Sequence, residues 1–276
     1  MNNLFAANFT RLKKSMVFWL CSLVMFVYIV IYMLNGCRQQ LSGIIGEVYS
    51  LEDYYFQFAM LIGLFVSVFI TLFLSTEYSD GVIRNKIIAG HTRRAIYLSN
   101  LFTVFLASLF IMLMGLLGGL VGIPVFGLWK MDALSLVCRL LILAMFLFAF
   151  CAIFTLINML SQNRAFSAVI TVLTFFALLM AASMIINRLA QPEMVSDALF
   201  TADGLVFSDP MPNPYYVSGT TRKLLDFIVD LIPAGQGQRL AINEAAHPLR
   251  MILSSAFVTV FATLCGLFLF EKRDLK

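Results

Sequence analysis

Six long runs of apolar residues divide the chain, and short polar segments separate them. A bilayer core about 30 Å thick needs about 20 apolar residues per helix, and the runs meet that requirement. None of them shows the alternation of apolar and polar residues that a membrane β-barrel strand requires. The pattern therefore predicts an all-α integral membrane protein. Its six transmembrane helices are expected at 16–34, 56–74, 101–125, 134–160, 165–186 and 251–270.

Two shorter amphipathic helices are predicted outside the spans. The first twelve residues place four apolar side chains on one helical face, next to three basic residues, which is typical of a helix lying on a membrane surface. A second apolar face between spans one and two has the spacing i, i+3, i+4 and i+7. The first face consists of Leu4, Phe5, Phe9 and Leu12, and the second of Leu41, Ile44, Ile45 and Val48.

The segment 187–248 is the longest connection, and we expect it outside the cytoplasm. Three closely spaced prolines at 210, 212 and 214 favour an extended loop rather than a helix or a strand. The apolar pattern at 220–232 predicts a surface helix that Pro233 stops. With about 60 residues, the segment is too short for an independent core, so the whole chain 1–276 is expected to be one transmembrane domain.

Composition supports the membrane assignment. Apolar residues make up 61% of the chain and charged residues 12%, whereas soluble domains contain about 45–50% and about 25%. These values exclude a disordered chain, a nucleic-acid-binding protein and an ordinary cytosolic enzyme. We therefore expect the lipid bilayer as a partner and no nucleic acid.

The distribution of charge predicts the orientation. The N-terminal segment, the connections after spans two and four, and the C-terminal tail together carry a net charge of +7, and the other side carries −3. Basic residues are enriched on the cytoplasmic side of membrane proteins. We expect a multi-pass protein of the bacterial cell membrane with both termini in the cytoplasm, the loop 75–100 cytoplasmic and the loop 187–248 extracytoplasmic.

Motifs for catalysis and cofactor binding are missing from the sequence. It contains no H-E-x-x-H metal motif, no G-x-x-x-x-G-K-[ST] phosphate loop and no G-x-S-x-G nucleophile elbow. We therefore expect no catalytic, metal or cofactor-binding residues in this chain. All fifteen acidic residues are expected in loops or tails, which argues against ion-coupled transport and favours energy from a partner.

The cytoplasmic loop 75–100 contains the most distinctive pattern. Gly81 and Gly90 enclose a predicted helix of about two turns at 82–89, and Thr92 can cap the next helix. Ile83 and Ile87 share one face of this short helix. Such a helix, held between two spans and flanked by basic residues, could press into a groove on a soluble partner. Basic residues here would also follow from the orientation alone, so a solvated loop is the alternative.

This loop resembles the coupling segment of type 2 ABC transporter permeases, in the bacterial branch that pairs with separate ATPases. The six spans, the basic amphipathic start and the Pro-Ala-Gly-Gln run at 233–236 agree with the resemblance. Val82 and Asn100 depart from it, standing where Thr and Lys are frequent. The pattern is carried by Glu77, Gly81, Arg84, Asn85, Lys86, Gly90 and Arg93.

The resemblance implies the membrane-spanning permease subunit of an exporter, which is not itself an enzyme. It implies a cytoplasmic ABC ATPase partner that binds ATP and Mg, and a second permease chain, identical or homologous. This branch often exports antimicrobial peptides or drugs, and the many phenylalanines of the spans would suit amphipathic or lipid-like cargo. The residues expected to couple the chain to the ATPase are Glu77, Gly81, Ile83, Arg84, Lys86, Ile87, Gly90 and Arg93.

Two alternatives stay open at this point. A membrane scaffold or sensor subunit that transports nothing would have similar hydropathy, and an integral membrane enzyme is disfavoured by the missing motifs.

In span three, Gly115 and Gly119, and likewise Gly118 and Gly122, are four residues apart, a spacing that lets helices approach closely. Packing within one subunit is the preferred interpretation, and a contact between two chains is the other.

Overall fold

The computed structural model describes residues 2–42, 49–79, 81–161, 163–196, 198–201 and 204–273. Within this part of the chain, six helical stretches are long and apolar enough to cross a membrane, which confirms the predicted fold class. They are Met16–Ser42, Leu51–Glu77, Arg93–Phe126, Ala133–Leu160, Arg164–Leu189 and Pro248–Lys272.

The spans are built from helices with short 3-10 turns between some of them. The second span joins α3, η1 and α4, and the third joins α6, η2 and α7. The helices are α1 Asn2–Lys14, α2 Met16–Ser42, α3 Leu51–Tyr55, η1 Gln57–Met60, α4 Ile62–Ser79, α5 Val82–Ile88, α6 Arg93–Gly119, η2 Leu120–Gly122, α7 Ile123–Phe126, α8 Ala133–Leu160, α9 Arg164–Leu189, α10 Gly219–Leu231, α11 Pro233–Ala241 and α12 Pro248–Lys272.

Polar caps explain why the helices extend beyond the apolar runs. The side chain of Thr92 accepts a hydrogen bond from the backbone N–H of Ala95 at the start of α6. Asp132 and Asn163 cap α8 and α9 in the same way. A cap satisfies backbone donors that the first helical turn leaves unpaired, so each helix begins at the cap rather than at the first lipid-facing residue.

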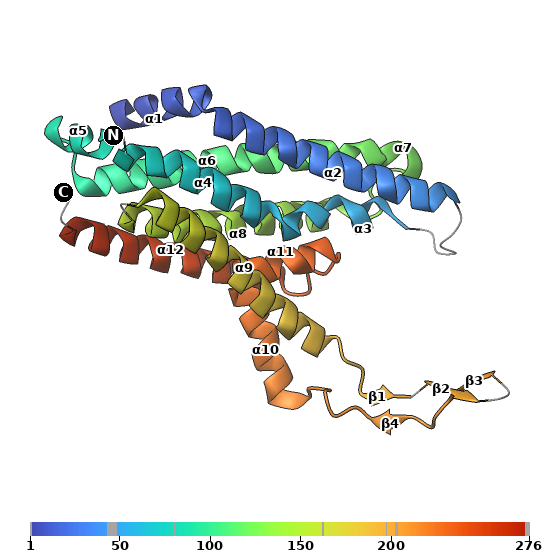
Figure 1. Cartoon of the computed structure of the whole chain (residues 1–276). Helices are drawn as coiled ribbons and strands as arrows, with labels where there is room; N and C mark the ends of the chain where they lie inside the picture. The colour runs from blue at the N-terminus through green and yellow to red at the C-terminus, as the bar shows by residue number, and fades with distance from the viewer. Residues whose placement is uncertain are drawn as a thin grey trace.

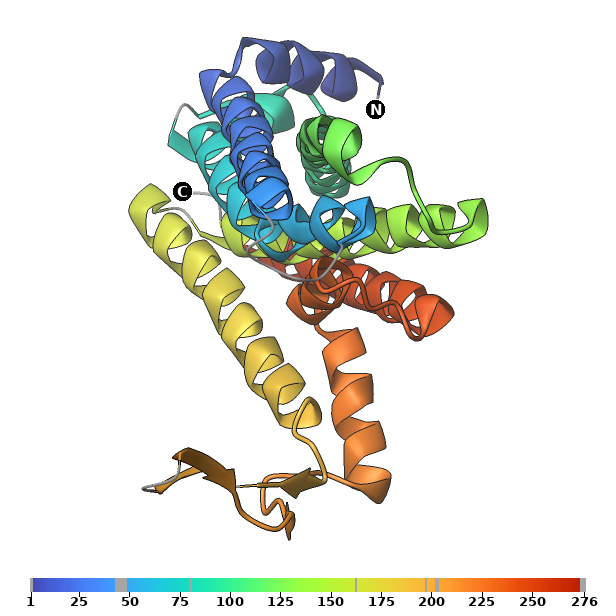
Figure 2. The same cartoon turned by 90° about the vertical axis from the view of Figure 1, so that its right-hand side faces the viewer.

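The spans form a bundle from which one helix diverges (Figure 1). Helices α2, α4, α6, α8 and α12 run side by side, while α9 leans away from them at one end (Figures 1 and 2). Helices α10 and α11 lie in the resulting wedge, and α11 packs against η1, α8 and α9. Helix α5 and both chain ends lie at the opposite end of the bundle from the strands.

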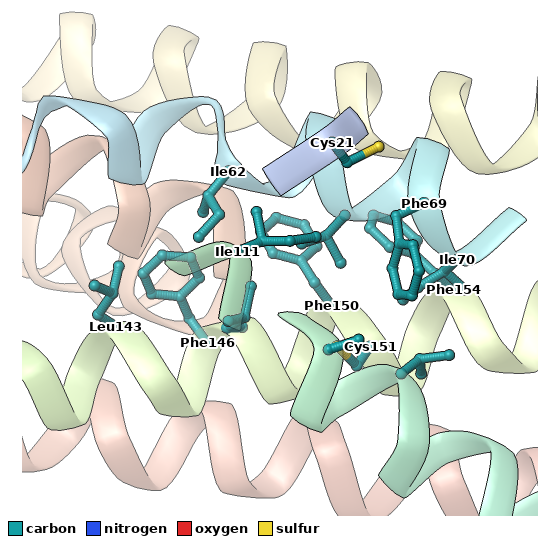
Figure 3. Close-up of a cluster of buried hydrophobic side chains, with 14 of the residues drawn as sticks. Cys21, Ile62, Phe69, Ile70, Ile111, Leu143, Phe146, Phe150, Cys151 and Phe154 are labelled. Carbon is teal, nitrogen blue, oxygen red and sulfur yellow. The ribbon is translucent and has the colours of Figure 1, made fainter. Parts of the chain in front are cut away.

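Aromatic side chains of α8 fill the centre of the bundle (Figure 3). Phe146, Phe150 and Phe154 are almost fully buried, and the rings of Phe150 and Phe154 stack with 5.3 Å between their centroids. They meet Phe69 of α4 and Ile111 of α6. Lipid tails are as apolar as these side chains, so close van der Waals packing, rather than escape from water, holds the helices together.

The glycines of α6 pack against helices of the same chain. A Cβ atom at Gly118 would lie 2.1 Å from Cγ2 of Ile29 in α2, and one at Gly119 would lie 2.7 Å from the ring of Tyr55. Gly115 and Gly122 meet similar neighbours within the chain. Packing inside one subunit, the preferred interpretation of this spacing, is therefore confirmed.

The segment 187–248 is more structured than the sequence predicts. The helix expected at 220–232 is confirmed as α10, and Pro233 begins a further helix, α11, that the sequence analysis missed. Two short antiparallel ladders precede them, β1 Met194–Val195 with β4 Met211–Pro212 and β2 Ala198–Thr201 with β3 Gly204–Phe207. The sequence predicts no strand around Pro212, but Pro212 lies in β4, so that expectation is wrong. A proline is tolerated there because a ladder of two residues at a sheet edge needs few backbone N–H donors.

The two predicted amphipathic helices differ in outcome. Helix α1 is present, and Leu4 and Leu12 of its apolar face are buried. The second one, between spans one and two, falls largely on residues 43–48, outside the described part of the chain.

Candidate functional site

Two glycines fix the ends of the short helix α5. Gly81 precedes the helix with φ 65°, and Gly90 follows it with φ 84°. The backbone N–H of Gly90 donates to the carbonyl of Ile87, and that of His91 donates to the carbonyl of Lys86. This pair of bonds is the Schellman motif, which needs a left-handed residue and therefore favours glycine. The helix predicted at 82–89 is thus observed at Val82–Ile88.

The side chains of α5 do not all face in the directions that the sequence analysis predicts. Ile83, which was expected on the face offered to a partner, is only 3% exposed and packs into this chain, and Ile87 is half-buried against the same core. For Ile83 the expectation is wrong, because α5 packs back against α4 and α6. For Ile87 it stays a prediction. The face that points away from the bundle carries Arg84, Asn85 and Ile88, and Ile88 is 74% exposed.

A buried carboxylate at the end of α4 holds α5 in place. The side chain of Glu77 is fully buried and accepts hydrogen bonds from three residues on three other helices. Arg11 Nη1 lies 2.5 Å from Glu77 Oε1, Lys86 Nζ lies 2.6 Å from the same oxygen, and Asn100 Nδ2 lies 2.6 Å from Oε2. Charge-assisted bonds of this length are the strong ones in proteins.

Asn8 of α1 completes this buried cluster, which we call the α5 anchor: Asn8, Arg11, Glu77, Lys86 and Asn100. Lys86 Nζ donates to Asn8 Oδ1 at 2.9 Å, and Asn8 Nδ2 donates to Asn100 Oδ1 at 2.9 Å. Burial lowers the pKa of the Lys86 ammonium, although Glu77 opposes this shift. The anchor joins α1, α4, α5 and α6, so these four helices are connected at one end of the bundle.

Arg93 and Arg94 connect the same end to the last span. Arg93 Nη1 donates to the backbone carbonyls of Glu271 at 2.9 Å and of Phe270 at 3.4 Å, and to that of Arg273. Arg94 forms an ion pair with the side chain of Glu271. The last carbonyls of a helix have no partner within it, and Arg93 satisfies those of α12.

Four acidic residues correct the expectation that all fifteen lie in loops or tails. Glu52, Asp53 and Glu77 lie within the second helical stretch and Glu271 lies within the last one, because these stretches extend past the apolar runs. Of these four, Glu52 and Glu77 are buried. Both have partners. Glu77 forms ion pairs with Arg11 and Lys86, and Glu52 accepts hydrogen bonds from the backbone N–H groups of Lys130 and Met131. Both are therefore structural acids with direct partners.

The sequence analysis missed a second charge cluster at the strand end of the bundle. Asp230 is fully buried and pairs with Arg239 of α11 at 2.6 Å, and Arg250 of α12 pairs with both Asp230 and Asp226. Burial raises the pKa of Asp230; burial also acts to raise that of Asp226, but hydrogen bonds from Arg250 and Arg239 outweigh it and lower the pKa. The partners of Asp226 are Arg239 and Arg250, which are remote along the chain, so no local sequence pattern indicates the cluster.

A cavity of about 360 Å³ adjoins this second cluster between α9, α10 and α11. Its lining combines Ile186 and Leu189 with Lys223, Asp226 and His247. In the described residues, no three potential His, Cys, Asp or Glu ligands come together as a metal site would require.

Six apolar helices, with a short helix anchored across one end, define a multi-pass integral membrane protein. Residues 4–178, more than half of the chain, match the family described as ABC-2 family transporter protein. The chain belongs to this family and is a permease subunit of an ABC transporter, so the resemblance seen in the loop 75–100 is confirmed. Membership implies association with an ABC ATPase and with membrane lipid, and a transport rather than a catalytic role. No curated protein matches the chain closely enough to count as a relative.

Proposed function

We propose that this chain is the permease subunit of an exporter whose separate, cytoplasmic ATPase docks on the outward face of α5. That ATPase would bind ATP and Mg, and this chain would bind neither. The contact face we propose consists of Arg84, Asn85 and Ile88. An exposed isoleucine on the same face as Arg84 and Asn85 suits the apolar centre of such a contact, because burying it would contribute about 1.5–3 kcal/mol.

The observation that carries this proposal is the α5 anchor. Helix α5 meets the bundle through Ile83 and through Lys86, whose ammonium bonds to residues of α1 and α4. A displacement of α5 by the ATPase would therefore move the ends of α1, α4 and α6 as one unit. Packed helices switch between discrete arrangements rather than deform continuously, so such a unit can act as a lever.

The remaining features of the proposal rest on charge and on the resemblance. The +7 side of the chain would face the cytoplasm of a bacterial cell, with both termini and α5 on that side. Two permease chains, identical or homologous, would face each other. The cargo class we propose is amphipathic, as an antimicrobial peptide, a drug or a lipid-like molecule would be.

The decisive experiment is Ile88→Asp in the full-length chain, co-expressed with a candidate ABC ATPase. The variant should insert normally, because Ile88 is exposed and lies outside the spans, but it should lose co-purification of the ATPase. Leu128→Asp is the matched control, since Leu128 is 71% exposed in the connection at the other end of the third span. Normal co-purification and normal cargo-stimulated ATP hydrolysis with Ile88→Asp would contradict the docking face and favour a solvated loop. A chain that binds no ATPase under any condition would instead support a scaffold or sensor role.

A further inference from the structure

An apolar groove of about 400 Å³ lies between α1, the first turn of α2 and the middle of α6. Phe9 and Lys13 of α1 border it, Trp19 comes from α2, and Leu106 and Phe110 come from α6. Because residues of α1 and of the first turn of α2 line it, the groove lies at the α1–α2 elbow. This elbow lies towards the end of the bundle where α5 is found (Figure 1). Its location at the start of the first span makes it accessible from one leaflet of a bilayer.

Aromatic contacts shape the wall of this groove. The ring centroids of Phe18 and Phe110 are 5.3 Å apart, and Trp19 meets Phe110 edge to face at 5.8 Å. The indole Nε1 of Trp19 donates to the backbone carbonyl of Lys13 at 2.9 Å, which ties the end of α1 to α2. Trp19 nevertheless remains 52% exposed, so an occupant of the groove would contact it directly.

The rim of the groove is cationic. Lys13 lines it and Lys14 follows, and both side chains are exposed, whereas the neighbouring Arg11 is paired with Glu77. The first 42 residues contain no Asp or Glu, so no acid of α1 or α2 compensates these two lysines. An apolar groove bordered by the exposed ammonium group of Lys13, with the exposed Lys14 as the next residue, is complementary to a molecule with an apolar chain and an anionic head.

We propose that this groove is a binding site for an anionic phospholipid of the surrounding bilayer. One acyl chain would lie along Trp19, Leu106 and Phe110, and the phosphate would contact Lys13 and Lys14. Lysine suits this role because its aliphatic stem packs on apolar surface while its ammonium reaches the headgroup level. The site is independent of the ATPase and of the direction of transport, and it would hold α1 on the membrane surface.

Quenching of Trp19 fluorescence by brominated lipids tests this proposal directly. The chain has two tryptophans, so Trp129→Phe leaves Trp19 as the single reporter. The purified full-length variant is reconstituted into phosphatidylcholine vesicles containing rising fractions of brominated phosphatidylglycerol or, separately, brominated phosphatidylcholine. We expect half-maximal quenching at a mole fraction at least about fivefold lower for the anionic lipid, as two juxtamembrane lysines predict.

Two further variants distinguish a specific lipid-binding site from a general attraction of anionic lipids to basic residues on the surface. Lys13→Gln combined with Lys14→Gln should abolish the preference while leaving quenching by phosphatidylcholine unchanged. Lys272→Gln combined with Arg273→Gln removes the same charge from the C-terminal end and should leave the preference intact. Equal quenching of Trp19 by the two lipids, or an equal loss of preference in both double variants, would overturn the proposal. Neither readout involves ATP, so these outcomes leave the exporter proposal untouched.

Discussion

The Nζ atom of Lys86 lies 2.6 Å from Oε1 of Glu77, and this contact joins the short helix α5 to the end of α4. Both side chains are buried, and Arg11 shares the same carboxylate. Burying charged groups is costly unless each has a partner of opposite sign. The pair therefore makes the position of α5 depend on the bundle, which is the property required of a coupling element.

Replacing Glu77 by Gln should destabilise the protein strongly. The change keeps the shape of the side chain but leaves Lys86 and Arg11 without a counter-charge, and breaking a buried pair in this way costs about 3–5 kcal/mol. We expect an apparent Tm lower by about 6 °C or more in detergent. The measurement is thermal unfolding followed by intrinsic fluorescence.

The matched variants for this prediction form a double-mutant cycle. Lys86→Met alone should be milder, because Glu77 keeps its bond to Arg11. Glu77→Gln with Lys86→Met should be less damaging than the sum of the single changes, with a coupling energy of about 1 kcal/mol or more. Strictly additive losses would show that the two side chains do not act as a pair in solution.

Gly90 should tolerate a residue that accepts a left-handed backbone and reject one that does not. Its φ is 84°, and no atom outside its immediate neighbours lies within 4 Å of a Cβ atom built there. Any effect of substitution therefore comes from backbone strain, about 1–2 kcal/mol for most residues, and not from a clash. Gly90→Val should end α5 at a different angle and weaken co-purification of the ATPase.

Asn is the control at this position because it visits the left-handed region more readily than other residues. Gly90→Asn should retain most of the association with the ATPase. If the Val and Asn variants co-purify equally well, the geometry of the helix end has no part in docking.

The orientation of the chain can be tested with single added cysteines. Ser218 is exposed at the start of α10, and Ala89 is exposed at the end of α5. A membrane-impermeant maleimide added to intact cells should label Ser218→Cys and leave Ala89→Cys unlabelled until the cells are permeabilised. The parent chain with its five free cysteines sets the background. The reverse pattern would place α5 outside and remove the basis for ATPase docking there.

The sequence was sufficient to predict the spans and the short helix, because both leave local signals. Long apolar runs predict the six helices, and Gly81, Gly90 and Thr92 mark the ends of α5 and the start of α6. The faces of α5 could not be predicted in the same way. Whether Ile83 points to a partner or to its own bundle depends on how α4 and α6 are placed. That placement cannot be predicted from residues 82–89 alone.

The charge clusters were missed for a related reason. Glu77 gains its role from Arg11, which is 66 residues away, and Asp226 gains its role from Arg239 and Arg250 on two later helices. The helix α11 lacks an apolar run, since its buried residues include Gln236, Gln238 and Arg239. A polar sequence inside a bundle is stable only when its partners are present, so hydropathy alone assigns it to a loop.

Close packing between α2 and α6 should make Gly118 sensitive to the addition of a single carbon. A Cβ atom there would lie 2.1 Å from Cγ2 of Ile29 and 3.0 Å from the carbonyl oxygen of Phe26. Forcing extra volume into a packed contact costs about 1–3 kcal/mol, so Gly118→Ala should lower the apparent Tm in detergent. Ile29→Ala should lower it too, by creating a cavity. The double variant should be more stable than the sum of the two losses predicts, because the new methyl group enters space that Ile29 has vacated. Additive losses would mean that α2 and α6 do not approach at this point, and that these glycines serve a contact outside the chain.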